Sequence, residues 1–77
     1  MDVKQKIDFM IMSLEIAKQE LEYAESYLKN PPSNRNDNRR FPNATIIREN
    51  LKSVARIGAI VSKEIVLSPY CSELYRK

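Results

Sequence analysis

Apolar residues recur along the first thirty positions of the chain at alternating steps of four and three. This line has eight consecutive members: Val3, Ile7, Met10, Leu14, Ala17, Leu21, Ala24 and Leu28. A period of 3.5 residues predicts a helix that packs nearly parallel to another helix. Asp2 and Gln5 have the spacing of a capping box, which starts a helix, and Pro31-Pro32 cannot continue one. We therefore expect a helix over about residues 2–29.

A second line with the same steps follows after residue 43: Ile47, Leu51, Val54, Gly58, Val61 and Ile65. Asn43 is a favourable N-cap, so we expect a helix over about residues 44–67. A glycine inside a helix costs about 1 kcal/mol relative to alanine, which predicts that another backbone approaches closely at Gly58. Ser68-Pro69 has the form of an N-cap followed by a helix-starting proline, and it predicts a short third helix over about 69–76.

These elements predict an all-α fold: a single domain, 1–77, that forms an antiparallel two-helix hairpin with a short C-terminal helix. The connection, residues 30–43, is longer than the 2–8 residues that usually join two packed helices. Phe9, Ile16 and Tyr23 form another apolar line on the first helix, whereas Asp8, Glu15, Glu22, Gln5, Gln19 and Ser26 form a polar stripe. One partner helix cannot cover two apolar lines.

The length and composition point to self-association. A chain of 77 residues buries only about 60–65% of its unfolded surface and is marginally stable alone. Disulfides, metals and oligomerisation are the usual remedies. Cys71 is the only cysteine and there is no histidine, so a disulfide within the chain and a structural zinc site are excluded. We therefore expect a homo-oligomeric helical bundle.

The same composition argues against catalysis. Without histidine, Cys71 and the serines lack the usual imidazole base, and a single glycine excludes the glycine-rich nucleotide loops. The glutamates at 15, 20, 22 and 25 are interpreted as a solvated face. We expect a protein that is not an enzyme and needs no cofactor or metal. No signal peptide is apparent and no apolar stretch approaches the ~20 residues that span a bilayer, so we expect a cytoplasmic protein without membrane contact.

Charge is distributed unevenly, with a net −2 over residues 1–30 and +5 over residues 31–77. Arg48, Lys52 and Arg56 are spaced four residues apart, and Arg39-Arg40 lies just upstream. Arginine makes bidentate contacts with phosphate, and a helix N-terminus attracts anions. In the alternative interpretation, the acidic residues of the first helix neutralise this basic stripe, either within an antiparallel hairpin or between subunits.

Aromatic and polar residues at the same end extend the candidate site. Phe41 is an aromatic plane on which a base can stack, and Thr45 lies at the start of the second helix. Tyr23 and Tyr27 are spaced to stack on the same ligand, although tyrosines at the edge of an apolar face are also common packing residues. The candidate ligand-binding residues are therefore Arg39, Arg40, Phe41, Thr45, Arg48, Lys52, Tyr23 and Tyr27.

Three families show resemblances of different extent. The stretch from Leu14 to Leu28 resembles the first helix of HEPN-type proteins, but the catalytic motif of that family is absent here, so its ribonuclease activity is not implied. The layout resembles the Rop class of plasmid RNA-binding hairpin dimers in architecture. About a third of the chain resembles the second helix of phage helical-hairpin sponge proteins of the anti-CBASS or anti-Thoeris type, in the residues Arg40-Phe41, Ala44-Thr45-Ile46-Ile47-Arg48-Glu49-Asn50-Leu51-Lys52 and Ser68-Pro69.

The third resemblance implies a function. Those phage proteins are oligomeric, and they counter bacterial defence by sequestering cyclic nucleotides without turnover. The expectation is thus an oligomer that sequesters a small anionic cyclic nucleotide at the candidate residues. The alternative is a helical module of regulatory role that binds RNA or another protein.

Overall fold

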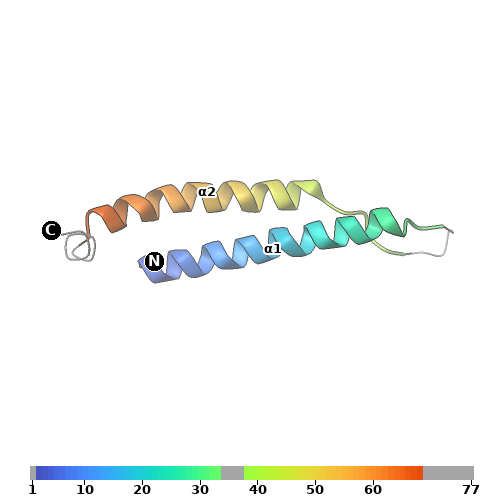
Figure 1. The fold of residues 1–77 in the computed structure, drawn as a ribbon, viewed down its shortest axis with the longest axis horizontal. Helices are drawn as coiled ribbons and strands as arrows, with labels where there is room; N and C mark the ends of the chain where they lie inside the picture. Colours follow the sequence, from blue (N-terminus) through green and yellow to red (C-terminus); the bar gives the residue numbers. More distant parts are fainter. Residues whose placement is uncertain (1, 34–37, 69–77) are drawn as a thin grey trace.

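The computed structural model describes residues 2–33 and 38–68. Helix α1 (Val3–Lys29) and helix α2 (Ala44–Val66) lie antiparallel along most of their lengths, and Figure 1 shows the resulting hairpin. This arrangement confirms the predicted all-α hairpin. The predicted short helix at 69–76 and Cys71 lie outside the described residues. Neither helix within the described part of the chain is long and apolar enough to cross a membrane.

Both helices begin at the caps that the sequence indicates. The Asp2 carboxylate accepts a hydrogen bond from the Gln5 backbone N–H at 2.8 Å, and the Gln5 side chain accepts one from the Asp2 N–H at 3.0 Å. The Asn43 side-chain oxygen accepts from the Thr45 N–H at 2.9 Å. These bonds satisfy N–H groups that have no partner inside a helix. At the other end of α2, the Ser68 hydroxyl donates to the Ile65 carbonyl at 2.6 Å.

The face of α1 that packs on α2 differs from the predicted apolar line. Apart from Val3 and Tyr23, the residues of α1 that are buried or half-buried follow another line with steps of four and three: Lys6, Met10, Ser13, Ala17, Glu20, Ala24 and Tyr27. Of the predicted line, only Val3, Met10, Ala17 and Ala24 are shielded. Its larger members are 41–78% exposed: Ile7, Leu14, Leu21 and Leu28. The predicted apolar line is therefore divided: half of its members lie in the hairpin contact, and the bulkier ones stay exposed at its side.

On helix α2, too, the contact face differs from the predicted apolar line. Its contact face is the line Ile47, Asn50, Val54, Ile57, Val61 and Glu64, whereas Leu51 and Ile65 are 47% and 37% exposed. A Cβ atom added at Gly58 would lie 3.4 Å from the methyl carbon Cε of Met10. That distance is an ordinary contact with the end of a flexible side chain. The close approach of another backbone that we expected at Gly58 is thus not found within the hairpin.

The interior of the described chain is small and partly polar. Ala17 and Val61 are its buried apolar residues, and Ser13 and Glu20 are buried beside them. An ion pair between Lys6 and Glu64, whose side chains are 23% and 35% exposed, joins the start of α1 to the end of α2. The contact between the two helices therefore contains small and polar side chains, while the bulky apolar ones lie at its sides.

Candidate functional site

Several of the predicted site residues gather at the closed end of the hairpin, where α1 ends and α2 begins (Figure 1). We call this group the hairpin-end cluster. It consists of Glu20, Tyr23 and Tyr27 from α1 and Arg39, Arg40 and Phe41 from the segment before α2. The two tyrosines reach the same side of the helix because they are spaced four residues apart.

Glu20 is the central anchor of the cluster. Its carboxylate accepts two hydrogen bonds from the Arg40 guanidinium, at 2.8 Å from Nη1 and 2.5 Å from Nη2, and a third at 2.8 Å from the Asn43 backbone N–H. The Glu20 side chain is only 5% exposed. The hydrogen bonds from Arg40, and after them the one from Asn43, lower the pKa of Glu20 to about 2. Charge-assisted, bidentate pairs of this kind fix geometry as well as charge.

This placement corrects the interpretation of the glutamates as one solvated face. Glu15, Glu22 and Glu25 are exposed as predicted, but Glu20 is buried. The sequence analysis missed Glu20 as a member of the cluster, and it considered Asn43 only as a helix cap and not as a partner of Glu20. One pattern in the sequence could have indicated that Glu20 belongs to the cluster. Glu20 lies on the line 6, 13, 20 and 27, which repeats every seven residues and includes Tyr27.

The Glu20 carboxylate occupies the position that the sequence suggested for a phosphate. It lies at the N-terminus of α2, where unpaired N–H groups and the helix dipole favour an anion, and it binds the N–H of the N-cap residue Asn43. The chain therefore supplies an internal anion to this helix end. Thr45 is exposed beside it, and its own N–H is bonded to the Asn43 side chain.

Arg40 is held on two sides. Its guanidinium carbon lies 4.4 Å from the centroid of the Tyr23 ring, a cation–π contact, while its nitrogens bind Glu20. The Tyr23 hydroxyl donates to the Arg40 backbone carbonyl. The hydrogen bond with Glu20 raises the pKa of Arg40. These contacts make Arg40 a residue that fastens the segment before α2 to α1.

Tyr27 links the remaining members of the cluster. Its ring centroid lies 5.4 Å from that of Phe41 at an interplanar angle of 65°, an edge-to-face contact, and 6.2 Å from that of Tyr23. The Arg39 guanidinium carbon is 5.4 Å from the Tyr27 centroid, and Arg39 Nη2 donates to the Asn30 carbonyl at 2.6 Å. Phe41 nevertheless remains 78% exposed, so most of its ring is open to a ligand.

An apolar cavity of about 300 Å³ adjoins the cluster, lined by Ala24, Tyr27, Leu28, Phe41, Ala44 and Ile47. Its lining suits an aromatic or aliphatic group, since it lacks the donors that a phosphate requires. Within residues 2–33 and 38–68, no three histidine, cysteine, aspartate or glutamate side chains gather in a way that could hold a metal ion.

The basic stripe, Arg48, Lys52 and Arg56, lies on the exposed side of α2, beginning one turn after Ala44, which lines the cavity beside Phe41. Lys52 Nζ is 4.0 Å from Glu49 Oε1 on the same helix. Neither Arg48 nor Arg56 forms an ion pair with a described residue. The contacts that join oppositely charged parts of the hairpin are instead Glu20–Arg40 and Lys6–Glu64. Pairing of the stripe with the acidic residues 15–25 inside one hairpin, one form of the alternative left open by the sequence, is therefore absent among the described residues, and pairing between subunits stays a prediction.

The structure thus separates the predicted site into two parts. It brings Tyr23, Tyr27, Arg39, Arg40 and Phe41 together, and it leaves Arg48 and Lys52 on the outer side of α2. Comparison of the chain with protein-family models, curated proteins and solved structures found no match.

Proposed function

We propose that this chain is a non-enzymatic binding protein that sequesters a small, phosphate-bearing nucleotide. One observation supports the proposal above the others: the three cations of the basic stripe are exposed, and neither of its two arginines forms an ion pair with a described residue. Exposed arginines without a carboxylate partner are available for phosphate, to which guanidinium groups bind in a bidentate manner. A cyclic nucleotide is the ligand class that the resemblance to the phage sponge proteins implies.

The residues of the hairpin-end cluster have two different roles in this proposal, positioning and ligand contact. Arg40 positions the segment before α2, because its guanidinium nitrogens bind Glu20 and its guanidinium carbon lies over the Tyr23 ring. Phe41 is the aromatic surface that a base contacts, since it is 78% exposed and borders the apolar cavity. Stacking of a base on an aromatic side chain is worth about 1–3 kcal/mol. The phosphates would be bound by the cations of the basic stripe.

Thermal unfolding with cyclic di- and trinucleotides tests the proposal. A ligand at 100 times its Kd stabilises the folded state by about 2.7 kcal/mol, which is a readily measured rise in Tm. We expect Arg48→Ala with Arg56→Ala to abolish this rise and to leave the Tm without ligand nearly unchanged. Lys18→Ala is the matched control, because Lys18 is an exposed cation on the outer side of α1. No rise in Tm at about 1 mM of any such nucleotide would contradict the proposal.

RNA is a second candidate ligand, favoured by the linear arrangement of the three cations along one helix. Each phosphate contact contributes about −0.7 to −0.9 to the slope of log K against log salt. RNA would be favoured over a small nucleotide if single-stranded and hairpin RNA bound with a steep slope of log K against log salt. Removal of Arg48 and Arg56 should then make that slope less steep. Equal affinity at low and high salt would exclude phosphate-dominated RNA binding.

A further inference from the structure

One side of the hairpin presents a continuous apolar surface, which we call the lateral face. It is formed by two lines of residues, Ile7, Leu14, Leu21 and Leu28 on α1 and Leu51, Gly58 and Ile65 on α2. Apart from Gly58, the six residues of these lines have side chains that are 37–78% exposed. Neither line contains a charged residue.

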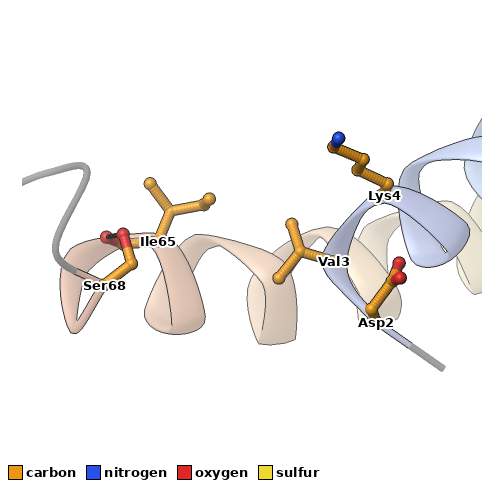
Figure 2. A pocket seen from close by; sticks show the side chains of 5 residues that line it. All are labelled: Asp2, Val3, Lys4, Ile65 and Ser68. Atoms are coloured by element: carbon orange, nitrogen blue, oxygen red, sulfur yellow. Dashed lines mark hydrogen bonds between the residues drawn. The ribbon is translucent and has the colours of Figure 1, made fainter.

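Two contacts place these lines on the same side of the molecule. Met10 Cε lies against Gly58, and Val3 and Ile65 line one hollow between the first turn of α1 and the last turn of α2 (Figure 2). The line 51, 58 and 65 of α2 therefore adjoins the line 3, 10, 17 and 24 of α1. On α1, the line 7, 14, 21 and 28 lies beside the line 3, 10, 17 and 24, on the side farther from the centre of the hairpin contact.

The distribution of side-chain sizes shows that the hairpin contact does not use the bulkiest apolar residues. Between the helices lie Ser13, Ala17 and Glu20, all buried. Leu14 follows Ser13 in the sequence and Leu21 follows Glu20, and these two leucines are 44% and 48% exposed. Burial of a leucine contributes about 1.5–3 kcal/mol, so an exposed row of such residues is typical of a surface that is buried in an assembly.

The length of the lateral face supports a partner of substantial size. Its exposed side chains run from Ile7 to Leu28 on α1 (Val3–Lys29), about 32 Å at 1.5 Å per residue. A second hairpin, whose helices have the same lengths, covers the whole of that distance. A hairpin of two helices is one layer thick, and domains need two packed layers to enclose a core.

The opposite side of the hairpin is a poorer candidate. Phe9 and Ile16 are each 42% exposed there, but Tyr23, which continues their line, is covered by the Arg40 guanidinium. The segment before α2 thus interrupts that side near the closed end. On the lateral face that segment comes in only at the last turn of α1, where Phe41 and Leu28 line the same apolar cavity, so the rest of the face along both helices stays open.

We propose that the lateral face is the interface with a second copy of this chain, so that two hairpins form a four-helix bundle. Two copies related by a two-fold axis present the same patch to each other, and a face without charges needs no complementary partner. This inference is independent of the proposed ligand, which binds on the outer side of α2.

Sedimentation velocity on the purified protein at 1–100 µM tests the interface. We expect the wild type to sediment as a dimer and its Tm to rise with concentration, as linkage requires for an assembly that is lost on unfolding. Leu14→Glu is expected to weaken self-association by roughly 100-fold or more, because each dimer loses two buried leucines. Ile16→Glu is the matched control on the opposite side, since Ile16 and Leu14 have nearly equal exposure.

Three outcomes would overturn the proposal. They are a 9 kDa wild-type monomer at 100 µM, a Tm that is independent of concentration, and dissociation by Ile16→Glu but not by Leu14→Glu. If Leu14→Glu unfolds instead of yielding a folded monomer, the concentration dependence of the wild-type Tm still decides between a dimer and a monomer.

Discussion

Replacement of Gly58 by alanine tests whether the hairpin alone explains the environment of this residue. The new methyl carbon would lie 3.4 Å from Met10 Cε, with no backbone atom as near. The substitution therefore adds an apolar contact and removes the backbone entropy cost of a glycine within a helix, about 0.8–1.0 kcal/mol. We expect Gly58→Ala to stabilise the protein by about 0.5–1 kcal/mol. A gain of 1 kcal/mol raises the Tm of a domain of this size by about 4–8 °C.

The assay is urea and thermal unfolding followed by circular dichroism at 222 nm. Ala59→Gly is the matched control, because Ala59 is exposed on the same turn of α2 and should lose about the same free energy that Gly58→Ala gains. If Ala59→Gly behaves as expected but Gly58→Ala lowers the Tm, the methyl group collides with something other than Met10. The reasoning from the hairpin contact would then be refuted, and a backbone from another chain would have to approach Gly58.

Further predictions concern the contacts that hold the hairpin together. The pKa of Glu20 in the folded chain, about 2, lies below its ordinary value of 4.5, so Glu20 contributes stability that is complete above pH 4.5 and is lost as the pH falls towards 2. The urea midpoint of the wild type should therefore fall over this range more steeply than that of Glu20→Gln, whereas the exposed-residue control Glu22→Gln should follow the wild type. Ala17→Leu enlarges a side chain that is 4% exposed between the helices and should cost about 1–3 kcal/mol in urea unfolding; a neutral effect would show that the helices are not in close contact there. Asn43→Ala removes the side-chain cap of α2 and should cost about 1 kcal/mol, whereas Asn38→Ala, exposed in the preceding segment, should leave the unfolding midpoint unchanged.

The existence and limits of the helices were predictable from local sequence. Capping by Asp2, Gln5 and Asn43 uses residues within three positions of each helix start, and Pro31 ends α1 by removing an N–H donor. Hydrophobic periodicity then indicated that the two helices pack along their length. All of these effects act over a few residues, so no knowledge of the tertiary structure was needed.

The choice of contact face and the role of Glu20 were not predictable in the same way. Leu14 and Ala17 belong to the same four-three line, yet α2 covers Ala17 and leaves Leu14 half exposed. Periodicity defines the apolar side of a helix, but it does not say which part of that side an intramolecular partner covers. The burial of Glu20 depends on Arg40, twenty positions away, and such a pairing is determined only when the chain folds back on itself.

Arg39 donates a hydrogen bond to the Asn30 carbonyl, and Arg40 donates one to Glu20. These bonds have a consequence for the connection between the helices. The hydrogen bond from Arg39 to Asn30 holds two described ends of the connection together, so a change in the length of the chain between them is a change in the length of a loop with fixed ends. Doubling the length of such a loop adds only about 0.6 kcal/mol of closure entropy. The connection can therefore lengthen or change in composition while α1 and α2 keep their register, because the bonds of Glu20 and the Lys6–Glu64 ion pair hold the helices in place at both ends.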